Sequence, residues 1–82
     1  MNITRQIAEG NNEFIWNGLD DYPLNSIFIT NAEDSITGII NQNPPGAVMQ
    51  AGGVYQGNFD VLKKDSSYIF QSNRMFAWTY PT

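Results

Sequence analysis

The chain has 82 residues, with four basic and eight acidic side chains for a net charge of −4, and it contains neither cysteine nor histidine. This length is enough for one domain, which cannot rely on disulfides or on thiolate and imidazole metal ligands. The acidic balance argues against a nucleic-acid binder, and no apolar run is long enough to span a membrane. Without histidine the commonest general base is missing, so we expect no enzyme, no cofactor and no bound metal.

The composition is neutral and aromatic for a small soluble chain. Only 15% of the residues are charged, whereas ten are Asn, five are Gln and eleven are aromatic. Aromatic side chains are enriched where protein subunits pack together. The composition therefore favours a protein that binds other subunits, or one that binds sugars.

Residues 1–12 are predicted to form an extended N-terminal arm. Ile3 and Ile7 lie four residues apart and could share one helical turn, which Gly10 and the asparagines after it would end. We expect this arm to bind a partner, with Ile3, Arg5 and Ile7 as the contact residues.

Residues 13–82 are predicted to form a single small β domain. Short apolar segments predict strands at 13–18, 26–30, 36–40, 47–52 and 53–62, with loops at 31–35 and 41–46. Residues 67–80 are predicted to form a hairpin with its tip at 71–74. About seven strands with this spacing indicate an all-β fold, a small barrel or sandwich of short antiparallel strands.

The glycines of the middle segment have a structural interpretation. Gly52 and Gly53 predict a tight bend, and Gly57 predicts a bulge or a close approach of two backbones. A phosphate-binding loop would need a different glycine spacing and a following helix, and the sequence has neither.

Two pairs of adjacent acids are the remaining candidates for chemistry. Asp20-Asp21 and Glu33-Asp34 could serve glycoside hydrolysis or calcium binding. Both pairs lie in predicted turns without the spaced oxygen ligands of a calcium loop, so we expect solvated turn residues.

The aromatic residues near the C-terminus alternate along one predicted strand. Phe76, Trp78 and Tyr80 would share one face of it, which could be core or subunit interface. We assign these three residues to a subunit interface. The rival interpretation is a sugar-stacking platform made by an exposed Trp16, Trp78 or Tyr80.

Residues 37–62 resemble the head decoration proteins of tailed phages, of the lambda type. The matching pattern is a glycine followed by two aliphatic residues, a loop, an aromatic residue and a Gly-x-Phe strand, which here are Gly38, Ile39, Ile40, Tyr55, Gly57 and Phe59. The resemblance implies a small β domain with an N-terminal arm that sits as a trimer on the outer capsid and clamps the major capsid protein.

The expected function is therefore that of a non-enzymatic virion protein, a capsid decoration or cement subunit, made in the host cytoplasm and located on the outer capsid surface. Its partners would be the major capsid protein and further copies of itself, as a homotrimer or another homo-oligomer, with no nucleic acid and no membrane. The alternatives are a tail, neck or fibre-base subunit, a carbohydrate-binding module, and a small acidic inhibitor of a host defence protein.

Overall fold

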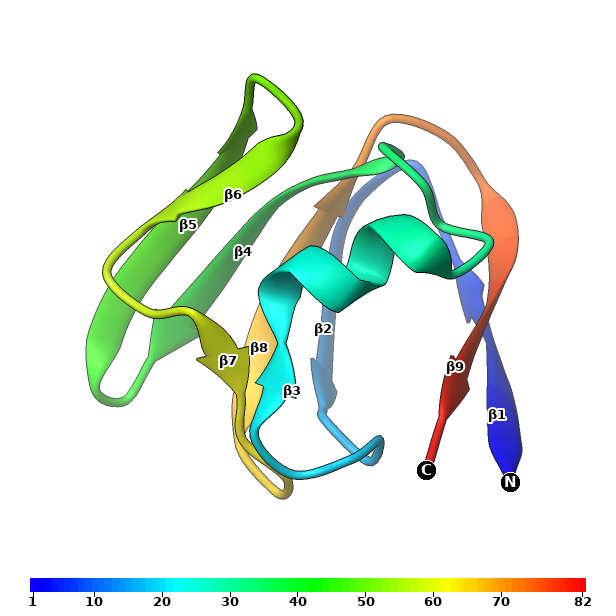
Figure 1. The fold of residues 1–82 in the computed structure, drawn as a ribbon, viewed down its shortest axis with the longest axis horizontal. Coiled ribbons are helices and arrows are strands. Elements are labelled where there is room, and N and C mark those ends of the chain that lie inside the picture. The colour runs from blue at the N-terminus through cyan, green and yellow to red at the C-terminus, as the bar shows by residue number, and fades with distance from the viewer.

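Nine short strands and one 3₁₀ helix build the protein, which a computed structural model describes over residues 1–82 (Figure 1). In chain order they are β1 (Asn2–Ile7), β2 (Gly10–Ile15), β3 (Tyr22–Pro23), η1 (Leu24–Ile29), β4 (Ile36–Gln42), β5 (Pro45–Ala51), β6 (Val54–Gly57), β7 (Val61–Leu62), β8 (Ser67–Ser72) and β9 (Phe76–Pro81). The expected all-β class is confirmed.

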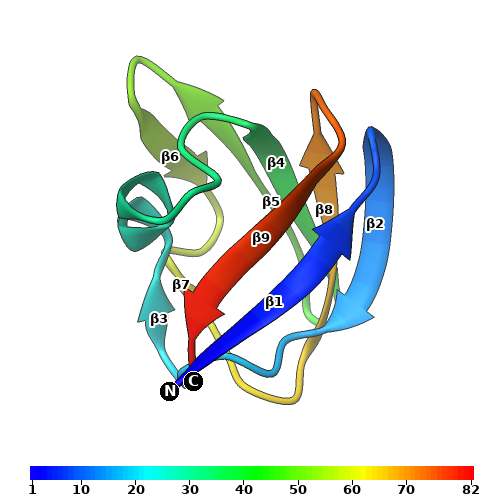
Figure 2. The same ribbon diagram turned by 90° about the vertical axis from the view of Figure 1, so that its right-hand side faces the viewer.

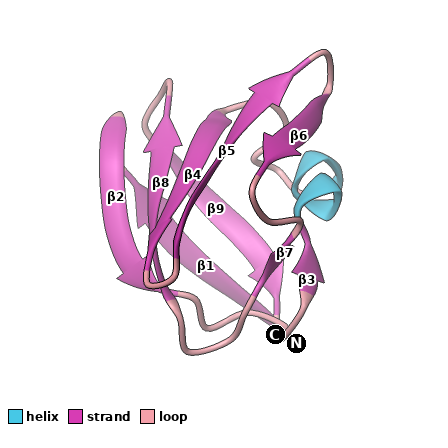
Figure 3. Ribbon diagram, turned by 90° about the vertical axis from the view of Figure 1, so that its left-hand side faces the viewer, coloured by secondary structure: helices cyan, strands magenta, loops and turns pink.

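The strands form three antiparallel sheets, and none of them closes into a barrel. The largest has the order β2-β8-β4-β5-β6, while β1 pairs with β9 and β3 pairs with β7. Figures 2 and 3 show the β1–β9 sheet crossing one face of the five-stranded sheet. The core lies between these two sheets.

Aromatic rings fill this core. The ring of Trp16 lies 5.7 Å from that of Trp78 and 4.5 Å from that of Tyr80, and the Phe70 ring of β8 meets Trp78 of β9 edge-on at 5.6 Å. The indole N–H groups are both satisfied, because Trp16 donates to the Leu19 carbonyl and Trp78 donates to a threonine hydroxyl. A small domain has little buried surface, so these large side chains supply much of what it can bury.

The predicted hairpin over residues 67–80 is wrong, because β8 and β9 belong to different sheets. The turn between them is held by Ser72, whose hydroxyl donates to the Arg74 carbonyl and accepts from the Arg74 backbone N–H. Asn12 holds the other crossing between the sheets, since its side-chain amide bonds both the N–H and the carbonyl of Ala8. Each polar side chain fixes a corner where the chain leaves one sheet for the other.

The predicted N-terminal arm is also wrong, because residues 2–7 form strand β1 along the whole length of β9. Ile3, Arg5 and Ile7 alternate with exposed residues and point inward, and Ile7 is completely buried. The alternation has a period of two, which is that of a strand, whereas the prediction considered only the four-residue spacing of the isoleucines.

The segment 26–30 is not a strand, because residues 26–29 belong to helix η1 and Thr30 caps the end of that helix. Leu24 and Ile27 are its buried residues, and their three-residue spacing matches the three residues per turn of a 3₁₀ helix. Asn25 accepts a hydrogen bond from the backbone N–H of Tyr55 in β6. Tertiary contacts therefore override the strand propensity of the isoleucines.

The glycine predictions are confirmed. Gly52 and Gly53 connect β5 to β6 with φ values of +62° and +81°, a left-handed conformation that favours glycine. A Cβ at Gly57 would lie 2.7 Å from the Cα of Val48 and closer still to the carbonyl oxygen of Ala47. Gly57 thus marks a close approach of two backbones.

Candidate interaction surface

The outer face of the five-stranded sheet is the candidate functional surface, because it is broad and nearly uncharged. It is the face turned away from β1 and β9 (Figure 3). The registers place side chains from all five strands on it: Asn11, Glu13 and Ile15 of β2, Ser67, Ile69 and Gln71 of β8, Gly38 and Ile40 of β4, Ala47, Met49 and Ala51 of β5, and Val54 and Gln56 of β6. We call this set the outer sheet face.

Apolar side chains of the outer sheet face remain open to solvent. Ile15 is 58% exposed and Met49 is 52% exposed, while Ile40 and Ile69 at the centre are partly exposed. Gly38 has no side chain of its own, and the Met49 sulfur and the Gln71 side-chain oxygen occupy the space where its Cβ would be. The centre of the face is therefore smooth, which suits contact with another protein surface.

Charge is almost absent from this surface. Glu13 is its single charged side chain, although the chain has twelve charged residues in all. The other face of the same sheet is the core. Strands β4 and β8 thus carry apolar residues on both faces, as is typical of sheets covered on both sides.

The size of the face limits how strongly one copy could bind. Four inter-strand spacings of about 4.8 Å give a width of about 19 Å, and a six-residue strand is about 20 Å long. The resulting footprint is about 400 Å², compared with about 800 Å² per partner in a standard stable interface. Firm attachment would thus need further contacts or several copies side by side.

The aromatic residues assigned to a subunit interface lie inside the domain. Trp78 and Tyr80 are almost completely buried and Phe76 is 8% exposed, so none of them can form a contact surface for a partner. Trp16 is completely buried as well. The interface assignment is therefore wrong, and so is the sugar-stacking platform, because both used aromatic rings that this small core needs.

Arg5 has a role within the domain. Its guanidinium lies 4.0 Å from the centroid of the Phe14 ring, which stacks on Phe70, and its Nε donates to the Tyr80 hydroxyl at 3.3 Å. Arg5 thereby bridges β1 and β2 where the two sheets diverge. The predicted partner-binding residues Ile3, Arg5 and Ile7 are brought together, but as the inner face of β1.

The acidic pairs are turn residues, as expected. The Asp20 carboxylate accepts the backbone N–H groups of Lys64 and Asp21, and the first of these bonds is the main reason why its pKa is lowered. Asp21 forms an exposed ion pair with Lys63. Glu33 and Asp34 are exposed in a turn. The structure contains no group of three or more His, Cys, Asp or Glu side chains placed to hold a metal.

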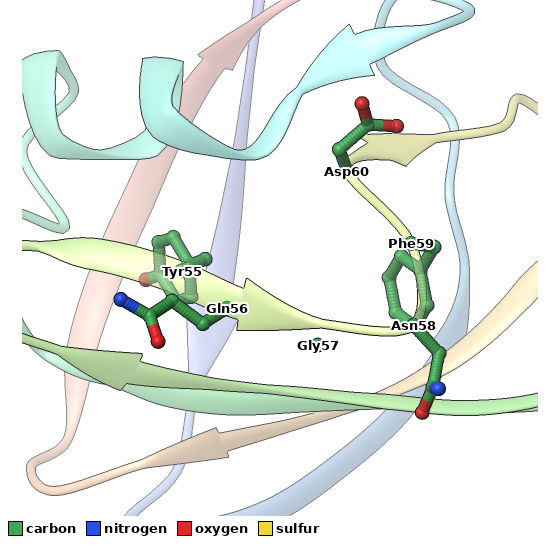
Figure 4. A pocket seen from close by; sticks show the side chains of 6 residues that line it. All are labelled: Tyr55, Gln56, Gly57, Asn58, Phe59 and Asp60. Atoms are coloured by element: carbon green, nitrogen blue, oxygen red, sulfur yellow. The ribbon is translucent and has the colours of Figure 1, made fainter.

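One shallow depression lies beside the edge of β6. Its lining is a continuous stretch of chain, residues 55–60, with Tyr55 and Gln56 at one end and Phe59 and Asp60 at the other (Figure 4). Tyr55 donates its hydroxyl to the Ile36 carbonyl at 2.5 Å and is buried, and this burial raises its pKa. The depression therefore offers backbone and amide groups and one carboxylate, that of Asp60.

The sequence carried a signal for the outer sheet face that the predictions did not use. The segments ITGII (36–40) and SYIF (67–70) are nearly continuous apolar runs, although a strand with one solvent-exposed face should alternate apolar and polar residues.

No helix of the structure is both long and apolar enough to cross a membrane. Comparison of the chain with protein-family models, curated proteins and solved structures found no match.

Proposed function

We propose that this protein is a non-enzymatic structural subunit of a tailed-phage particle, where it decorates the outer capsid by binding the major capsid protein. The observation that carries the proposal is the nearly uncharged outer sheet face, with Met49 and Ile15 exposed on it. The resemblance of residues 37–62 to head decoration proteins names the class of particle. The binding surface differs from the arm that the resemblance implied.

The small footprint is compatible with this role. A decoration protein binds a shell that repeats the same site many times, so neighbouring copies can support one another. Uncharged apolar and amide side chains give contacts that salt screens little, in contrast to attachment through surface ion pairs.

The first test is the number of copies in purified particles, measured by quantitative mass spectrometry against the major capsid protein. About one copy per capsid subunit would support decoration. A few to a few dozen copies per particle would contradict decoration and favour a neck, tail or fibre-base subunit. Absence from particles would refute the virion role as a whole.

A second test asks whether the outer sheet face makes the contact. Met49→Glu places a charge near the centre of the face, and we expect it to lower occupancy on particles at least about tenfold, because an unpaired charge resists desolvation. The matched control is Ile29→Glu, since Ile29 is 86% exposed on η1, away from this face. Equal occupancy of the two variants would refute the assignment of the face.

A further inference from the structure

The free edge of β1 presents a regular row of backbone groups without partners. The Thr82 N–H donates to the Met1 carbonyl, which fixes which residues of β1 and β9 bond each other. In an antiparallel ladder such pairs alternate with pairs whose N–H and C=O groups point away. The backbone groups of Asn2, Thr4 and Gln6 therefore point outward from the sheet, where no strand adjoins β1 (Figure 2).

The other edge of this sheet, along β9, shows the same alternation of inward and outward backbone groups. On β9, however, the outward N–H and C=O groups are already bonded. On β9 the partners of Thr4 and Gln6 are Thr79 and Ala77. Asn31 accepts from the Thr79 N–H at 2.8 Å and donates to the Ala77 carbonyl at 2.6 Å. Pro81 has no N–H to present. The edge of β9 is thus closed to another strand.

The edges of the five-stranded sheet are also protected. On β6, the outward N–H of Tyr55 is taken by the Asn25 side chain. On β2, the Trp16 N–H bonds the Ser66 carbonyl across the ladder with β8. Because inward and outward residues alternate, the backbone groups of Asn11, Glu13 and Ile15 point away from β8. A second copy pairing there about Glu13 would bring two carboxylates directly opposite each other, which is unfavourable.

We propose that the free edge of β1 binds the β1 edge of a second copy of this chain, antiparallel and centred on Thr4. In that register Thr4 lies opposite Thr4 of the second copy, and Asn2 lies opposite Gln6. The N–H and C=O groups of Asn2, Thr4 and Gln6, six in each copy, then all find partners. None of these three residues carries a charged side chain. The two β1–β9 sheets become one four-stranded sheet.

The self-complementary row is what favours a second copy as the occupant. Natural sheet edges are commonly blocked by charge, proline or a bulge, and β1 has none of these on its outward residues. Two threonines facing each other form a favourable cross-strand pair, and so do amide side chains that can exchange hydrogen bonds. The inference stands apart from the proposed function, because the pairing edge and the outer sheet face belong to different sheets.

The test is the solution mass by sedimentation equilibrium up to about 1 mM chain, the range in which weak dimers are populated. The wild type should approach twice the 9.2 kDa of one chain. Thr4→Lys should raise the dimer dissociation constant at least about tenfold, because it places two ammonium groups opposite each other. Ala77→Lys is the matched control, because it adds the same charge to the same exposed face of the β1–β9 sheet, but on β9 and away from the pairing edge. It should leave the dimer dissociation constant within about twofold of wild type.

A second measurement on the wild type keeps the proposal testable if a variant misfolds. Amide exchange followed by NMR should slow at Asn2, Thr4 and Gln6 as the concentration rises, and should stay unchanged at Glu13 on the edge of β2. A monomer at every concentration would overturn the proposal and leave the edge to a strand of another protein. A mass of three chains, or a dimer that Thr4→Lys does not weaken, would overturn it too.

Discussion

Replacing Gly57 by alanine tests how tightly β6 is held against β5. The new Cβ would lie 2.7 Å from the Cα of Val48 and closer to the carbonyl oxygen of Ala47, so both obstacles are backbone. Relief requires the strands to separate, which breaks the bond from the Asn58 N–H to the Ala47 carbonyl, 3.0 Å long. Overpacking costs about 1–3 kcal/mol, and the lost bond adds about 1 kcal/mol.

The expected loss of unfolding free energy is therefore about 2–4 kcal/mol, a large part of the 4–12 kcal/mol or so expected for a chain of this length. Urea unfolding followed by tryptophan fluorescence should show the midpoint lowered by about 2–4 M, for a slope near 1 kcal/mol/M. Gly52→Ala is the control, because no atom lies within 4 Å of its Cβ and only its φ of +62° is unfavourable. A loss for Gly57→Ala no larger than that for Gly52→Ala would refute the reasoning.

Three further predictions concern single polar or backbone features. Tyr80→Phe removes the hydroxyl that donates to the Asn17 side chain at 2.5 Å, and urea unfolding should show an unfolding free energy lower by about 1–3 kcal/mol. A decrease below about 0.5 kcal/mol would contradict this hydrogen bond. Burial raises the pKa of Tyr55 above its ordinary value of 10.0, so the unfolded chain loses this proton more readily than the folded protein does. The unfolding free energy should therefore fall as the pH rises above about 10. The variant Tyr55→Phe, though less stable at neutral pH, should show a shallower fall, and equal slopes for the two proteins would argue against a raised pKa of Tyr55. Glu33 has a φ of +51°, which costs about 1–2 kcal/mol in a non-glycine residue, whereas glycine adds about 0.4–1 kcal/mol of unfolded-state entropy. The net gain of about 0.8 kcal/mol should raise the melting temperature of Glu33→Gly by about 3–6 °C, and a lowered melting temperature would be inconsistent with strain at Glu33.

Local sequence signals predicted the elements that local chemistry decides. The strand at 36–40, the bend at Gly52-Gly53 and the close approach at Gly57 depend on β-branched side chains or on glycine geometry, and all three are confirmed. Helix η1 was missed because its three-residue spacing of Leu24 and Ile27 is short and is surrounded by residues that favour strands.

The sheet partners could not be predicted in the same way. Alternation shows that Phe70 and Trp78 each lie on an apolar face, but it does not show whether their strands lie side by side or face each other across the core. The candidate surface was missed for a related reason. A period of two indicates which residues share a face, and only the sheet topology shows that Met49, Ile40 and Ile69 share the outer one.

The pairing of β1 with β9 has a consequence for how the chain folds. Each contact of this ladder joins residues about 70–80 positions apart, and Trp78 at the centre of the core is among the last residues of the chain. Contacts between such distant positions form slowly, because a long loop must close before they contribute. Until β9 has paired with β1, the aromatic inner face of the five-stranded sheet stays open to water. Completion of the core is therefore a late step of folding, and the burial of Trp78 should report it.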